Sequence, residues 1–185
     1  MARRMDTSRL RWLWVGLWLT TIYAVSPVTP ELVKLIDGAI GRRGFQLTVY
    51  GGLVGAVVGV GGYLGRRGVG FGSRRLYSHF ALPLLPVLAA SWHIAQPQQL
   101  WHIPEYAVLA MLFAWALSRH LTAGPLRSLA AMSLCVHAGC LDEIIQFYLP
   151  NRVFDPADIL LDGVGALVGV GLAALLGARG AAEGV

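Results

Sequence analysis

Residues 156–177, PADILLDGVGALVGVGLAALLG, decide the fold. This stretch of 22 residues carries two aspartates, Asp158 and Asp162, near its start and no charged residue after them. A helix needs roughly 20 mostly apolar residues to cross the hydrocarbon core of a bilayer. The stretch is therefore predicted to be a transmembrane helix with two carboxylates in its first turns.

Five further apolar runs precede it, at 10–28, 46–65, 76–96, 101–119 and 128–149. The run at 46–65 is rich in glycine and only weakly hydrophobic, and Pro104 suits the first turn of the fourth helix. Apolar residues make up 56% of the chain and charged residues 14%, whereas soluble domains carry about 25% charged residues. We expect an all-α, polytopic transmembrane bundle of about six helices, forming one integral membrane domain over residues 1–185, and not a soluble enzyme.

The placement of Lys and Arg predicts the orientation of this bundle. If the helices alternate in direction, 11 of the 15 basic residues fall on the side of the N-terminus and 4 on the other side. The positive-inside rule then places both the N- and C-termini in the cytoplasm. Because the arginines flank apolar runs in pairs, the bilayer is the expected partner and nucleic acid is not. A cleaved signal peptide ending near Ala24-Val25-Ser26 is the alternative for the first run.

Two features of the helices concern their packing. Small residues recur every four positions on two helices, which allows close helix approach within the monomer or, alternatively, self-association: Gly51, Gly55 and Gly59, then Gly165, Gly169, Ala173 and Gly177. Residues 31–45 are expected on the outer side, either as a plain loop or with a short interfacial helix over 31–36.

Acidic residues converge at one end of the predicted bundle. Six of the ten in the chain lie between positions 105 and 162, and the topology puts all six near the outer face: Glu105, Asp142, Glu143, Asp155, Asp158 and Asp162. On the last helix the aspartates follow the spacing i, i+3, i+7, so they share the face that Gly165 and Gly169 continue. A carboxylate at membrane depth is costly unless it is paired, protonated or hydrated, and such groups are candidates for function.

The residue types in this cluster predict specific roles. The catalytic candidates are Glu143 or Asp142 as general base, His102 as general acid or metal ligand, and Glu105 beside it. Arg152, with Gln146 and Tyr106, is expected to bind an anionic substrate. A divalent metal ion is the possible cofactor, and its predicted ligands are Asp142, Asp155, Asp158 and Asp162.

Structural roles are the alternative for several of these residues. Asp155 precedes Pro156 and suits the N-cap of the last helix. Asp142 or Glu143 could form an ion pair with Arg152, and Gln146 could bond between helices. The histidines His79, His93, His120 and His137 have no acidic neighbour in register and are assigned to structure. The cysteines Cys135 and Cys140 lie in an apolar run and are expected to be small core residues.

At these residues the chain resembles the VanZ-like family of bacterial integral membrane proteins. The matching elements, over about 76–177, are His102-Ile-Pro-Glu-Tyr106, then the pattern from Asp142-Glu143 through Gln146, Pro150, Arg152, Asp155 and Asp158, and Gly165 with Gly169. Asp162 stands where the family often has Asn, and Asn151 stands in a turn that often reads Pro-Gly-Arg. The resemblance implies a bacterial inner-membrane protein of the cell envelope, associated with teicoplanin resistance or envelope polymers, and it implies no defined reaction.

Three functions compete on these grounds. The first is an enzyme acting on an anionic or lipid-linked envelope precursor at the outer leaflet. The second is a non-catalytic module that binds glycopeptide, lipid precursor or a partner enzyme. The third is an ion-coupled transporter, which is less well supported because the polar groups cluster at one end of the bundle.

Overall fold

The computed structural model describes residues 7–66, 96–122 and 124–180, and these ranges are mostly helical and contain no strand. The elements are α1 (Thr7–Val25), the 3-10 turn η1 (Ser26–Val28), α2 (Thr29–Arg66), the 3-10 turn η3 (Pro97–Trp101), α5 (His102–Leu117), α6 (Gly124–Phe147) and α7 (Pro156–Gly180). The all-α prediction is confirmed, and α5 begins two residues before Pro104, as expected for a proline in the first turn.

The number of candidate membrane spans differs from the six predicted. The described residues contain four: Thr7–Arg66, Pro97–Leu117, Gly124–Phe147 and Pro156–Gly177. The first two predicted runs belong to one helical stretch of 60 residues, because η1 joins α1 to α2 without a break in helical structure. The run at 76–96 lies, except for Gln96, outside the described residues.

Residues 31–45 are also helical, so the prediction of a plain loop is wrong and the alternative of a helix over 31–36 is confirmed. They form the first part of α2, which bends at Gly41 (φ 71°, ψ 161°). A positive φ of this size is open to glycine and costly for other residues, which explains why the bend falls there.

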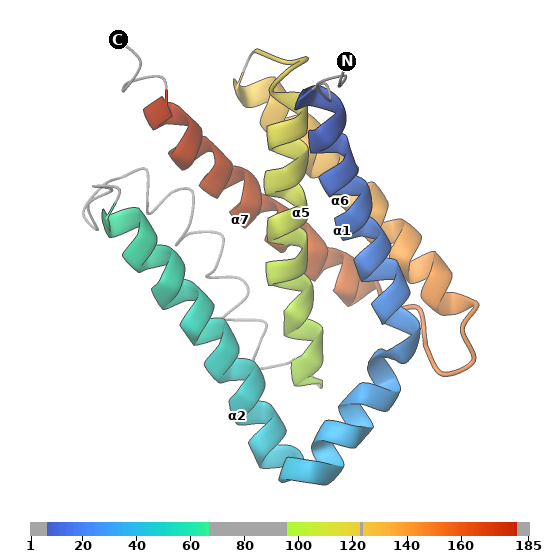
Figure 1. Cartoon of the computed structure of the whole chain (residues 1–185). Helices are drawn as coiled ribbons and strands as arrows, with labels where there is room; N and C mark the ends of the chain where they lie inside the picture. The colour runs from blue at the N-terminus through green and yellow to red at the C-terminus, as the bar shows by residue number, and fades with distance from the viewer. Residues whose placement is uncertain (1–6, 67–95, 123, 181–185) are drawn as a thin grey trace, which may run out of the picture.

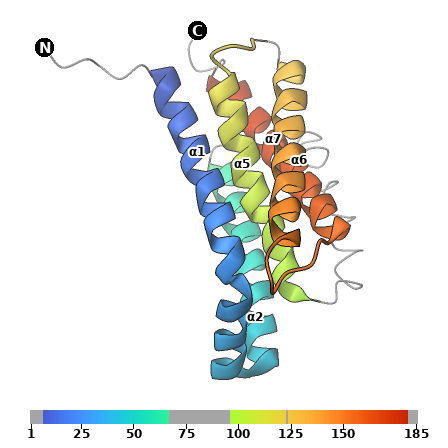
Figure 2. The same ribbon diagram turned by 90° about the vertical axis from the view of Figure 1, so that its right-hand side faces the viewer.

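The three helices α5, α6 and α7 alternate in direction (Figure 1). The start of α1 and the end of α7 lie at one end, and the opposite end collects the start of α5, the end of α6 and the start of α7. The view turned by 90° shows α5 between α1 and α6 (Figure 2). The acidic residues predicted to converge belong to these three helix ends, so chain direction alone brings them to the same end.

The closest helix contact in this arrangement is between α5 and α7. A Cβ atom added at Gly165 would lie 2.5 Å from the carbonyl oxygen of Ile103, and one added at Gly169 would overlap the carbonyl oxygen of Ala107. Two glycines thus let the α7 backbone touch the α5 backbone, and the prediction that this face makes a close helix contact is confirmed.

The other glycine face has no such neighbour. A Cβ atom added at Gly51, Gly55 or Gly59 meets nothing within 4 Å in the part of the chain that the structure describes. The prediction of packing within the monomer is therefore not confirmed for α2 in these residues.

Candidate functional site

His102, the first residue of α5, contacts two carboxylates of α7. Its Nδ1 lies 2.8 Å from Oδ1 of Asp162, and its Nε2 lies 3.6 Å from Oδ2 of Asp158. The side chain of Asp162 is fully buried and that of Asp158 is 8% exposed. Because the two aspartates are four residues apart, they occupy one face of α7, the face that meets α5.

Asp162 fits between α5 and α6 because α6 has a glycine opposite it. A Cβ atom added at Gly139 would overlap Oδ2 of Asp162 and lie 3.1 Å from its Cγ. This role of Gly139 was not predicted. The spacing of residues on α6 does not reveal which of them faces a carboxylate of α7.

The next aspartates along this face are joined by Gln99 of η3. Its Nε2 donates to Oδ2 of Asp155 at 2.8 Å and to Oδ1 of Asp158 at 3.0 Å. Asp155 also caps α7, since its Oδ1 accepts the backbone N–H of Ala157 at 2.9 Å. The structural alternative for Asp155 is therefore confirmed, and the residue contacts the polar cluster as well. Gln99 was not predicted, because it lies before the helix in which the other candidates were recognised.

The end of α6 supplies the remaining polar groups. Glu143 Oε2 accepts the backbone N–H of Asp155 at 2.7 Å, which ties α6 to the start of α7. Gln146 donates from Nε2 to Oδ2 of Asp142 at 2.9 Å, and its Oε1 accepts from Nε of Arg152 at 2.8 Å and also from Nη2. The alternative of a direct ion pair between Arg152 and Asp142 or Glu143 is not observed; Gln146 lies between them.

Several buried polar atoms of this centre have no hydrogen-bond partner among the described residues. They are the Tyr106 hydroxyl, Asp142 Oδ1, Glu143 Oε1 and Asp162 Oδ2. Tyr106 also stacks on His102, with ring centroids 6.3 Å apart and an interplanar angle of 11°. Buried polar atoms are normally satisfied, so the centre has the capacity to bond to a proton, water or a bound group.

We call His102, Tyr106, Asp142, Glu143, Gln146, Arg152, Asp155, Asp158 and Asp162, with Gln99, the polar centre. Glu105 is partly buried one turn after His102, and its backbone oxygen accepts the Trp18 indole N–H at 3.0 Å. Within the described ranges, no three His, Cys, Asp or Glu side chains are grouped so as to hold a metal ion. The divalent-ion site stays a prediction.

The histidines and cysteines that were assigned to structure lie outside the polar centre wherever the structure describes them. His137 is exposed and bonds to the carbonyl oxygen of Ser133 in its own helix at 2.7 Å. His120 lies 3.5 Å from the Ser8 hydroxyl, and Cys135 is buried in the core. His79 and His93 lie outside the described residues.

Two aromatic residues of α1 donate hydrogen bonds to the backbones of α5 and α6 beside the polar centre. Besides the bond from Trp18 to Glu105, the Tyr23 hydroxyl donates to the carbonyl oxygen of Ala138 at 3.1 Å. Tyr and Trp usually find a partner for their polar atom when buried, and that requirement is the signal in the sequence that could have indicated these contacts.

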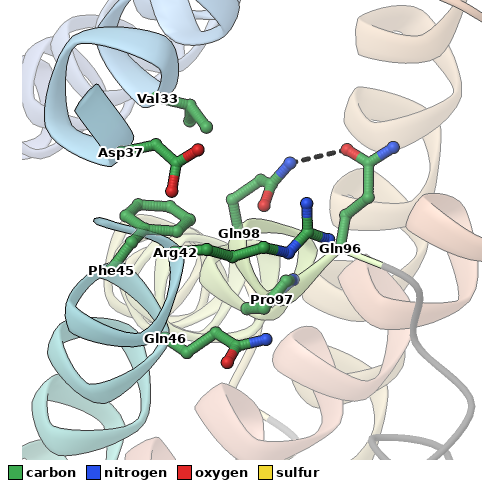
Figure 3. Close-up of a pocket in the computed structure, with 8 residues that line it drawn as sticks. All are labelled: Val33, Asp37, Arg42, Phe45, Gln46, Gln96, Pro97 and Gln98. Atoms are coloured by element: carbon green, nitrogen blue, oxygen red, sulfur yellow. Dashed lines mark hydrogen bonds between the residues drawn. The ribbon is translucent and has the colours of Figure 1, made fainter.

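A separate cavity of about 300 Å³ lies at the same end of the molecule (Figure 3). Its described lining comes from α2 and from the residues around the start of η3: Val33, Asp37, Arg42, Phe45, Gln46, Gln96, Pro97 and Gln98. No predicted site residue is among them. Gln99, the next residue along, bonds into the polar centre, so η3 links the two regions.

Long apolar helices around a buried polar centre define the class: this is a helical membrane protein. The family model described as VanZ/LLP1 matches residues 82–177, and the chain belongs to this family. The match covers η3, α5, α6 and most of α7 and contains every residue of the polar centre, and the resemblance predicted from the sequence is confirmed. Comparisons with curated proteins and with solved structures gave no significant match.

Proposed function

We propose that this protein is a multi-pass protein of the bacterial cytoplasmic membrane that acts on an anionic or lipid-linked envelope substrate at the outer face. The polar centre is the proposed site. Family membership supports a role at the envelope, and the arrangement around His102 supports acid–base chemistry.

The contact between His102 and Asp162 is the observation that carries this proposal. A buried carboxylate 2.8 Å from Nδ1 orients the imidazole ring, which is how histidines used in proton transfer are commonly held. Nε2 is 3.6 Å from Asp158, beyond the distance of a good hydrogen bond, so it is available to a bound group. His102 would give or take a proton there, and the unpartnered oxygens of Asp142 and Glu143 are the candidate bases.

Substrate binding is assigned to the rim of the same centre. Arg152 is only partly buried, and it uses Nε and Nη2 on Gln146. Its remaining N–H groups would bond a phosphate or carboxylate, a pairing in which guanidinium is strong and directional. Tyr106 would contribute its hydroxyl. A divalent ion, where one is bound, would be held by the carboxylates of Asp142, Asp155, Asp158 and Asp162.

The test is a set of charge-removing, nearly isosteric variants scored in a susceptible bacterial host. We expect His102→Gln, Asp142→Asn and Glu143→Gln to abolish any change in teicoplanin susceptibility that the wild-type chain confers. Glu31→Gln is the matched control, because Glu31 is exposed and forms an ion pair with Lys34 away from the polar centre. Full activity of the three variants, at wild-type membrane level, would contradict the proposed chemistry.

A non-catalytic binding module is the second candidate, because the burial of the carboxylates favours a structural role for them over acid–base chemistry on a substrate. Asp142, Glu143 and Asp162 are at most 2% exposed, and none of them lines the described cavity. A binder would tolerate Asp142→Asn far better than an acid–base site, so this variant distinguishes the two candidates. A transporter would instead require solute flux in proteoliposomes that an uncoupler abolishes.

A further inference from the structure

The cavity between α2 and η3 carries side chains of both charges. The bend of α2 is at Gly41, and Asp37 lies before it and Arg42 directly after it. Within the described residues neither side chain forms an ion pair, and the buried Oδ1 of Asp37 has no hydrogen-bond partner. Figure 3 shows Arg42 reaching across toward Gln96 and Gln98 of the opposite wall. The bend thus places a carboxylate and a guanidinium on the same cavity without pairing them.

The rest of the lining suits a small polar ligand. Three glutamines offer amide donors and acceptors, and Gln98 Nε2 donates to Gln96 Oε1 at 2.6 Å, which fixes the orientation of this pair. Phe45 provides an apolar surface. A volume of about 300 Å³ is at the lower end of the range for ligand pockets, so the cavity suits a head group and not a whole lipid.

We propose that this cavity binds a small zwitterion that combines an ammonium and an anionic group, with phosphoethanolamine as the simplest example. Arg42 would bind the phosphate through two N–H groups, as guanidinium groups commonly do, and Asp37 would accept from the ammonium. The ligand is either the head group of a membrane lipid or a free zwitterion of the same chemistry. The proposal does not depend on the chemistry assigned to the polar centre.

The experiment uses the full chain, purified in an uncharged maltoside detergent, and native mass spectrometry to count bound lipid. We expect phosphatidylethanolamine to be retained about tenfold better than phosphatidylglycerol, which lacks the ammonium, and better than phosphatidylcholine, whose quaternary nitrogen has no N–H for Asp37. Arg42→Gln should remove this retention. Arg43→Gln is the matched control. It removes the same charge from the neighbouring residue, whose side chain does not line the cavity.

A second variant and a soluble ligand sharpen the result. Asp37→Asn should make retention of the ethanolamine and glycerol lipids equal, while the thermal midpoint stays near that of wild type. Calorimetry with glycerophosphoethanolamine distinguishes the two sources of the ligand. Binding heat that is present in wild type and absent in Arg42→Gln indicates that the head group alone binds. Retention of phosphatidylethanolamine without any binding heat from the soluble compound indicates that the ligand is a membrane lipid. Equal retention of all three lipids by wild type, or equal losses in Arg42→Gln and Arg43→Gln, would overturn the proposal.

Discussion

The α5–α7 contact and the α2 helix use the same small-residue spacing with opposite results. On α7, Gly165 and Gly169 meet the backbone of α5, whereas on α2, Gly55 and Gly59 meet nothing among the described residues. Within the most apolar 18 residues of each helical stretch, 56% of the residues are buried in α7 and 11% in the stretch formed by α1 and α2. A four-residue glycine repeat therefore shows that a helix can be approached closely, and it does not show that another helix of the chain does so.

The largest difference in stability is expected between two variants that each break an ion pair. One breaks the buried pair of His102 and Asp162 between α5 and α7, and the other breaks the exposed pair of Lys34 and Glu31 on α2. Asp162→Ala leaves His102 buried beside Asp158 without its nearer partner, and removing one member of a buried pair costs about 3 to 5 kcal/mol. Glu31→Ala removes the Lys34–Glu31 pair, whose side chains are 69% and 63% exposed, and such pairs contribute little. Thermal unfolding in detergent should show a large loss of stability for the first variant alone; similar midpoints would contradict the tight packing of Asp162.

Adding one methyl group to each glycine face sharpens the comparison. Gly169→Ala forces a Cβ against the carbonyl oxygen of Ala107, and overpacking of this kind costs about 1 to 3 kcal/mol. Gly55→Ala, in open space, should be neutral or stabilising by up to about 1 kcal/mol, because alanine is the better helix former. The thermal midpoint should fall in Gly169→Ala and should stay the same or rise in Gly55→Ala. A loss of stability in Gly55→Ala would indicate a partner on α2 that the described residues do not include.

The close contact between Gly139 of α6 and the Asp162 side chain can be tested in the same way, with a smaller expected loss of stability. Gly139→Ala should push the carboxylate away from α6 and cost about 1 to 2 kcal/mol, since the obstructed group is a side chain and can shift. Gly163→Ala, next to Asp162 on α7, has nothing within 4 Å of the added Cβ and serves as control. Equal stability of the two variants would argue against the close approach of Gly139 and Asp162.

The N-cap of α7 should give the smallest change. Asp155→Ala removes the bond from the Ala157 N–H and the bond from Gln99, and losing a cap costs about 1 kcal/mol. Asp155→Asn keeps an oxygen at the same position and should recover most of the stability. If the asparagine variant were as unstable as the alanine variant, the charge of Asp155, and not its capping bond, would be the stabilising feature.

Most of the polar centre was predictable because helix direction and spacing are both encoded locally. Asp158 and Asp162 share a face by periodicity, and alternating helices bring them to the end where His102 begins α5. Gln99 and Gly139 were missed for different reasons. Gln99 is in a 3-10 turn with no periodic pattern, and Gly139 matters only through a neighbour from another helix.

The first two predicted helices show a different limit. The runs at 10–28 and 46–65 are recognisable from apolar length alone, yet the residues between them were open to either loop or helix. They are helical because Gly41 absorbs the bend, so the chain turns without leaving helical structure on either side. Nothing in composition distinguishes such a bend from a loop.

Composition, apolar length and spacing by themselves determined a helical membrane protein and the end at which its acidic residues meet, and the motifs that begin at His102 and Asp142 indicated its family by resemblance. These properties depend on single helices and their order, which are written along the chain. The pairing of His102 with Asp162, the bridge made by Gln99 and the charged cavity at the bend of α2 were decided only by the tertiary structure. Each depends on how far one helix is rotated and shifted against another, and that is set by packing of side chains distant in sequence.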